Sequence, residues 1–166
     1  MRNIDVVNQE KRNPMRKLWG RLKSLQSTVI FMQTGAHPDD ETSKLLVRLA
    51  LKDGFHVVYV NAVRGHGGQN SIGPERGDDL GYIRSEELFH AMSVFGADIG
   101  WLSETIEDPI IDFGLSKSGK ETLGIWGEQY TKRQMVKMVR TFKPDIMIPT
   151  FLDVPGQHGH HRAVTE

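Results

Sequence analysis

The sequence contains no cysteine among its 166 residues, and this absence limits how the chain can be cross-linked or bind a metal. Without thiols it can form neither a disulfide nor a zinc site built on cysteine thiolates. Any metal must therefore be held by histidine, aspartate or glutamate. The seven histidines are consequently the first residues to consider.

The chain also lacks an excess of charge and any long apolar run. Its 21 basic residues balance 21 acidic ones, so the composition does not support bulk electrostatic binding to nucleic acid or to an anionic membrane. No run of about 18 apolar residues predicts a membrane-spanning helix. No secretory signal is visible, so we expect a cytoplasmic location. The balance of apolar and charged residues is that of a globular domain.

We divide the chain into a basic N-terminal arm, residues 1–26, and one domain, residues 27–166. The first 25 residues hold seven basic and two acidic side chains. Leu18, Trp19 and Leu22 recur at helical spacing and predict a short amphipathic helix that packs on the domain or on a neighbour. A basic helix on a membrane surface is the alternative.

The hydrophobic pattern after residue 26 alternates between short apolar runs and helical periodicity. The predicted strands are 27–33, 55–61, 99–102 and 145–150, and the predicted helices are 41–52, 82–95 and 130–142. Strand, helix and strand within about 35 residues form a βαβ unit with a parallel pair of strands. We therefore predict a Rossmann-like three-layer α/β fold with a mainly parallel sheet and a site at the carboxyl ends of the strands.

Two long connections carry no clear period. Residues 62–81 are rich in glycine but match neither the Walker pattern nor the dinucleotide fingerprint, so we interpret them as a loop that covers the site. Residues 103–129 are expected to be a lid, a binding loop or an excursion, with Trp126 as an anchor.

The stretch Ala36–Glu41 reads A-H-P-D-D-E and follows the first predicted strand. His37, Asp39 and Asp40 meet there at a strand-to-helix turn, where Pro38 restricts the backbone. Parallel sheets bind ligands just beyond the carboxyl ends of their strands. The simpler alternative makes Asp39 or Asp40 the cap of the next helix, which explains neither the histidine nor the second carboxylate.

A second polar group follows the last predicted strand and contains three histidines in four residues, His158, His160 and His161. The alternative is an exposed polar loop or a tag remnant, although a tag would be an uninterrupted run. Together the two loops bring these candidates to one edge of the sheet: His37, Asp39, Asp40, His158 and His161. Catalytic zinc takes three protein ligands and a water, so two histidines and one aspartate would suffice and leave one carboxylate and one imidazole for proton transfer.

These motifs resemble those of the PIG-L/LmbE-like N-deacetylases, which include N-acetylglucosaminyl-phosphatidylinositol de-N-acetylase. The family's A-H-P-D-D-E motif stands at Ala36–Glu41, its R-x-x-E-L helix at Arg84–Leu88 and its H-x-x-H-R-A element at His158–Ala163. A P-D pair before the last strand also matches, at residues 144–145. The resemblance extends from residue 29 to the end of the chain.

The resemblance implies a zinc-dependent hydrolase that removes an N-acetyl group from an N-acetylglucosamine-type sugar conjugate. It implies His37, Asp40 and His161 as metal ligands, with Fe²⁺ as an alternative ion. It further implies Asp39 as general base, His158 as oxyanion stabiliser or acid, and Arg84 as a substrate contact. We add His66 and Asn70, from the glycine-rich loop, as substrate-binding residues. Homo-oligomer formation is left open.

The chain departs from the family pattern in three ways. His160 replaces an aspartate between the two histidines, and Gly156 stands where some members have tyrosine. The family domain usually continues further, so we expect a truncated C-terminus. Two other functions remain alternatives: a non-catalytic nucleotide- or sugar-binding module, and an amidase acting on a non-sugar amide.

Overall fold

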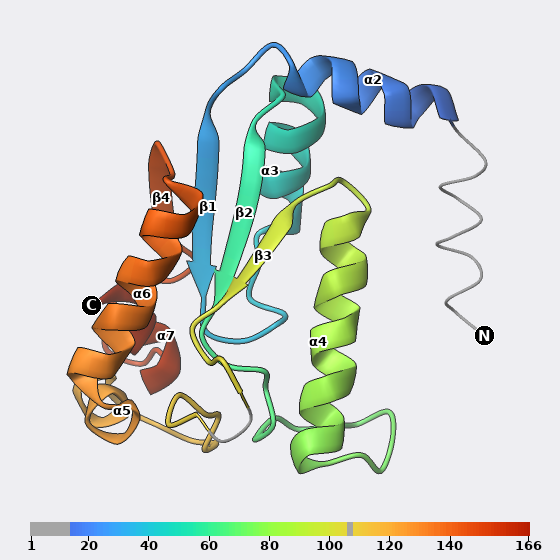
Figure 1. Ribbon diagram of the computed structural model, residues 1–166. Coiled ribbons are helices and arrows are strands. Elements are labelled where there is room, and N and C mark those ends of the chain that lie inside the picture. The colour runs from blue at the N-terminus through green and yellow to red at the C-terminus, as the bar shows by residue number, and fades with distance from the viewer. Residues whose placement is uncertain (1–13, 106–107) are drawn as a thin grey trace.

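The computed structural model describes residues 14–105 and 108–166, and within them four parallel strands form one sheet (Figure 1). The strands are β1 (Ile30–Gly35), β2 (His56–Asn61), β3 (Asp98–Trp101) and β4 (Ile146–Pro149). Their order across the sheet is β3-β2-β1-β4. β1 and β2 therefore occupy the centre, and all four carboxyl ends lie at the same edge.

Helices cover both faces of this sheet. In chain order the helices of the described residues are α2 (Pro14–Ser24), α3 (Ser43–Arg48), the π-helical segment η1 (Leu49–Asp53), α4 (Gly77–Ser93), α5 (Gly119–Trp126), α6 (Glu128–Phe142) and α7 (Gly159–Thr165), and α2 lies outside the two faces. The predicted Rossmann-like, three-layer α/β fold is confirmed.

Alternation along the central strands divides the core into two halves, because successive side chains of a strand point to opposite faces. Met32 and Val58 pack with side chains of α5, α6 and α7 on one face. Phe31 and Val57 pack with side chains of α3, η1 and α4 on the other. Both faces of β1 and β2 are thus buried, which explains the unbroken apolar runs at residues 30–32 and 57–60.

Three helices differ from the sequence-based expectation. α5 lies inside segment 103–129, for which we expected no regular structure; the Ser118 side chain caps it by accepting a hydrogen bond from the N–H of Glu121. α4 begins five residues earlier than predicted, with Asp78 and Asp79 in its first turn, where acidic side chains favour a helix start. α7 begins at Gly159, so that His160 and His161 lie in its first turn.

Helix α2 forms part of the predicted basic arm, and residues 1–13 of that arm lie outside the described residues. It packs against η1, where Gly20 lies beside Leu51. Leu18, Trp19 and Leu22, which suggested an amphipathic helix, are exposed. Within the described part of the chain, no helix has both the length and the apolar character needed to cross a bilayer.

Trp126 is the largest fully buried side chain, and its replacement by alanine tests this core. Its indole Nε1–H donates to the carbonyl of Ile111 at 2.8 Å. We expect Trp126→Ala to lower the free energy of unfolding by about 3–5 kcal/mol, measured by urea denaturation. Val136→Ala on the exposed side of α6 is the control and should change it by no more than about 0.5 kcal/mol. A loss below about 1 kcal/mol for Trp126→Ala would contradict this packing.

Candidate metal centre

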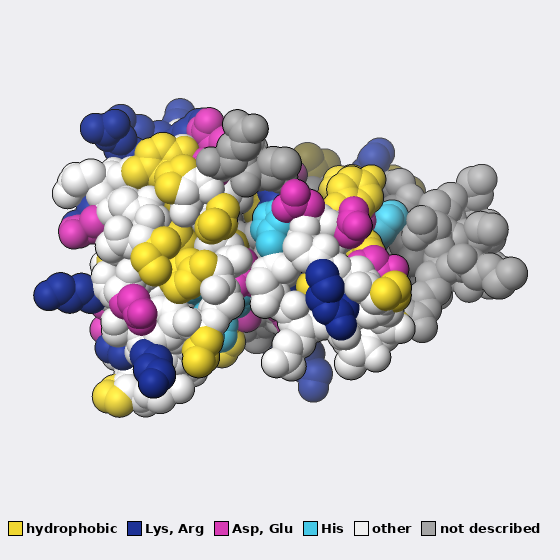
Figure 2. Space-filling view, turned by 90° about the horizontal axis from the view of Figure 1, so that it is seen from below, with side chains coloured by type: hydrophobic (Ala, Val, Ile, Leu, Met, Phe, Trp, Pro, Cys, Tyr) yellow, Lys and Arg dark blue, Asp and Glu magenta, His cyan; other side chains and the backbone are white. Residues whose placement is uncertain are grey.

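The A-H-P-D-D-E motif forms the turn directly after β1, at the carboxyl edge of the sheet. The buried Tyr59 hydroxyl donates to the carbonyl of His37 at 3.1 Å and so ties this turn to β2. A side chain at Gly35 would collide with the Tyr59 ring, which explains the glycine that precedes the motif. Seen from this edge, histidine side chains reach the surface near the middle of the molecule, beside acidic ones (Figure 2).

Asp40 folds back over the turn and does not cap the next helix. Its Oδ2 accepts hydrogen bonds from the backbone N–H groups of Ala36 (3.0 Å) and His37 (2.7 Å). The N-cap of α3 is Thr42, which makes no side-chain capping bond, so the capping alternative was wrong for both aspartates. Burial raises the pKa of Asp40, but hydrogen bonds with His161 and His37 outweigh it and hold this pKa well below its usual value.

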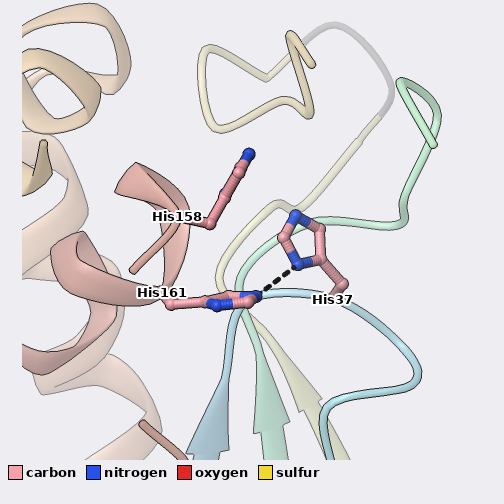
Figure 3. A group of neighbouring side chains, drawn as sticks. All are labelled: His37, His158 and His161. Carbon is pink, nitrogen blue, oxygen red and sulfur yellow. Dashed lines mark hydrogen bonds between the residues drawn. The ribbon is translucent and has the colours of Figure 1, made fainter. Parts of the chain in front are cut away.

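The three predicted metal ligands converge at one point. His37 Nδ1 lies 3.2 Å from His161 Nε2 (Figure 3), His161 Nε2 lies 3.3 Å from Asp40 Oδ1, and His37 Nδ1 lies 3.4 Å from Asp40 Oδ2. A tetrahedral zinc ion with bonds of about 2.0–2.1 Å separates its ligand atoms by about 3.3–3.4 Å. The two histidine nitrogens are thus spaced as zinc ligands would be, and each of them faces a different oxygen of Asp40.

Two other groups of donors share His37 with this set. One adds His158 and His161, and the other adds Asp112 and His160. In the second, Asp112 lies 3.8 Å from both His37 Nε2 and His160 Nδ1. That spacing exceeds the edge of a zinc tetrahedron. The set of His37, Asp40 and His161 is therefore closer to zinc spacing than the set with Asp112 and His160.

His158 precedes α7, and both of its ring nitrogens have partners. Its Nε2 lies 3.0 Å from the carbonyl oxygen of Gly114, so Nε2 carries a hydrogen and donates it. Its Nδ1 accepts from the backbone N–H of His160 at 3.3 Å and caps the helix. Burial lowers the pKa of His158, and neighbouring His37 lowers it further. The neutral ring is therefore favoured over the protonated acid that we considered from the sequence.

His160 and Asp112 are site residues to which the sequence analysis gave no role. The His160 ring is fully buried between Phe113 and Trp126, at centroid distances of 4.5 and 5.2 Å. Burial lowers its pKa to about 3, with a further contribution from His37, so the ring is neutral. The sequence could have indicated Asp112 in one way: it lies in the segment that follows β3, and the carboxyl end of β3 lies at the same edge of the sheet as the site.

Arg84, on α4, contacts the predicted general base. Its Nη2 lies 2.6 Å from Oδ1 of Asp39, and its Nη1 donates to the carbonyl oxygen of Gly65 at 3.1 Å. Gly65 has a φ of +80°, and a side chain there or at Gly68 would run into the guanidinium. These two glycines of the loop at residues 62–76 thus let the backbone approach Arg84 and fix where it points.

The other two predicted substrate-binding residues are not bonded to the histidine cluster. Asn70 is used within its own loop, where Oδ1 accepts from the N–H groups of Ile72 and Gly73 at 3.0 Å. The His66 side chain is mostly buried, with its Nε2 3.8 Å from Asp78. Among the described residues, neither makes a hydrogen bond to the cluster, so their contact with substrate stays a prediction.

The parallel sheet and the donors at its carboxyl edge define an α/β protein with a candidate metal centre at its strand ends. A family model described as "PIG-L: GlcNAc-PI de-N-acetylase" matches residues 32–166, so the chain belongs to the PIG-L family. No curated protein gives a significant match.

A solved structure of N,N'-diacetylchitobiose deacetylase from Pyrococcus horikoshii, complexed with an inhibitor, is similar in fold, with a TM-score of 0.58 and 19% identity. The similarity covers 95% of this chain and 55% of that one, so this chain spans about half the length of that relative.

Substituting the converging donors tests the metal centre. His37→Ala, Asp40→Ala and His161→Ala should each weaken zinc binding by more than about 100-fold. Residues that only hydrogen-bond to a metal ligand contribute about 10–100-fold, and loss of a direct ligand should cost more. Zinc affinity is measured by competition with a chromophoric chelator. His90→Ala, in the last turn of α4, is the control and should bind zinc as the parent chain does. Unchanged affinity in all three variants would refute the ligand set.

Proposed function

We propose that this protein is a zinc-dependent N-deacetylase that removes the acetyl group from an N-acetylglucosamine-type sugar conjugate. The observation that carries the proposal is the convergence of His37, Asp40 and His161 at 3.2–3.4 Å, with the Asp39 carboxylate next along the chain. Membership of the PIG-L family supports the reaction type. The printed name of the similar structure, a diacetylchitobiose deacetylase, supports the sugar class.

His37, Asp40 and His161 would hold the metal, with Fe²⁺ as the alternative to zinc because imidazole and carboxylate donors suit both ions. When bound, such an ion supplies Lewis-acid chemistry: it lowers the pKa of a coordinated water to about 7 and polarises the amide carbonyl. The hydrogen bonds from the N–H groups of Ala36 and His37 keep the Asp40 carboxylate oriented for this role.

Asp39 is the residue that moves the proton. Its side chain is 78% exposed, and Arg84 holds one of its oxygens at 2.6 Å. As water attacks the acetyl carbon, Asp39 takes its proton and then gives it to the departing amine. A carbon–oxygen bond forms and the carbon–nitrogen bond breaks, which leaves acetate and the free amino sugar.

His158 would stabilise the negative charge that develops on the carbonyl oxygen. It would do so as a neutral donor through Nε2–H, because burial disfavours its protonated form. That hydrogen is given to Gly114 in this structure, so the substrate oxygen must replace the Gly114 carbonyl as acceptor.

The substrate would lie over the histidine cluster, between the loops at residues 62–76 and 103–118. Arg84 is our first candidate for a substrate contact, since it lies beside Asp39, with His66 and Asn70 as further candidates. The class of acyl donor is tested by screening N-acetylated sugars, including N,N'-diacetylchitobiose, and simple N-acetyl amides for released amine. If only the simple N-acetyl amides release amine, the substrate class is a general amide and not a sugar conjugate. No release by zinc-loaded protein would favour a binding module.

Asp39→Asn separates the general base from the metal site. Asparagine keeps the shape of the side chain but is not basic, so turnover should fall by about 10²–10⁴-fold, the range for loss of a positioned base. Zinc content should remain near that of the parent chain, because Asp39 is not one of the three converging donors. Both are measured on the same preparation, as amine release and as metal per chain. Turnover within a few-fold of the parent would exclude Asp39 as the base.

A further inference from the structure

His37 presents its two ring nitrogens to different partners. Its Nδ1 faces Asp40 and His161, whereas its Nε2 lies 3.1 Å from Nδ1 of His160. A neutral imidazole carries one hydrogen, on one nitrogen or the other. His37 can bind a metal through Nδ1 only if that hydrogen is on Nε2, and a hydrogen at this half-buried position needs an acceptor.

His160 is placed to be that acceptor. It lies in the first turn of α7, and its side chain has no solvent exposure. Phe113 and Trp126 lie close to its ring and restrict the positions it can take. If Nδ1 of His160 accepts, its own hydrogen sits on Nε2, an atom with no hydrogen-bond partner among the described residues. The 3.1 Å contact is thus the interaction through which the His160 ring can act on the site.

We propose that His160 is a positioning residue: its Nδ1 accepts the hydrogen of His37 Nε2 and thereby directs the lone pair of His37 Nδ1 toward the metal. The inference rests on one part of the proposed function, the metal site, and does not depend on the deacetylation reaction. Among the contacts of the described residues, His160 reaches the donor atoms of neither Asp40 nor His161, so it acts through His37.

Charge explains why an imidazole suits this position. Asp112 is buried, with its Oδ1 3.8 Å from Nδ1 of His160, and it already places a carboxylate here. A second carboxylate at position 160 would face the buried Asp112 from a fully buried position, where like charges repel strongly. A neutral ring supplies the acceptor without that cost.

Two substitutions separate the hydrogen bond from the packing. In His160→Asn the amide oxygen can take the place of Nδ1, whereas His160→Leu fills the site without an acceptor. We expect the leucine variant to bind zinc about 10–100-fold more weakly, the range for loss of an outer partner, and the asparagine variant to stay within about threefold of the parent chain. Trp126→Phe is the control, because it disturbs the packing beside His160 but leaves the acceptor in place.

The second readout is the tautomer of His37 in metal-free protein, measured by two-bond ¹⁵N–¹H correlation NMR. Simple loosening of the fold would not shift this tautomer in a defined direction. The parent and asparagine variants should carry the hydrogen on Nε2, and the leucine variant should show a larger fraction on Nδ1. An unchanged tautomer or unchanged zinc affinity in His160→Leu would overturn the proposal. Neither readout uses amine release, so the absence of deacetylase activity would refute the proposed function and leave this inference standing.

Discussion

The parallel pairing of β4 with β1 is the constraint on which the site depends. Phe31 to Thr34 of β1 pair in register with residues 146–149 of β4, and the N–H of Thr150 extends the pairing by donating to the carbonyl of Thr34. At the other end of the pair, the Asp145 carboxylate accepts from the N–H of Ile30 at 2.8 Å. This register aligns two loops that lie more than 100 residues apart in the sequence, so that His161 can reach His37.

Much of this arrangement could be predicted from the sequence, because the signals are local or follow from topology. Short apolar runs alternating with helical periodicity predict a parallel sheet, and a parallel sheet gathers its carboxyl ends at one edge. The motif at residues 36–41 places an imidazole and two carboxylates in one turn. Three histidines after the last predicted strand, at positions 158, 160 and 161, supplied candidates at the same edge, and the resemblance to the PIG-L/LmbE-like family indicated His161 among them.

The remainder depends on side-chain directions that a sequence pattern does not contain. The Asp40 carboxylate turns back to backbone N–H groups and not forward to the helix. Asp112 and His160 meet His37 only because α5 and the segment before it pack beside α7. Asn70 has a polar side chain suited to binding, yet its own loop uses its oxygen. Each outcome is decided by a neighbour that is distant in sequence or by competition within a turn.

The contact between Arg84 and the carbonyl of Gly65 has a consequence for protein engineering. The loop at residues 62–76 lies beside the site and would be a natural target for altering substrate preference by loop exchange. The same loop supplies the oxygen that orients Arg84, and Arg84 in turn orients Asp39. In the proposed mechanism, substrate selectivity and proton transfer would therefore be coupled, and a transplanted loop would have to reproduce the backbone approach at Gly65 to keep Asp39 in place.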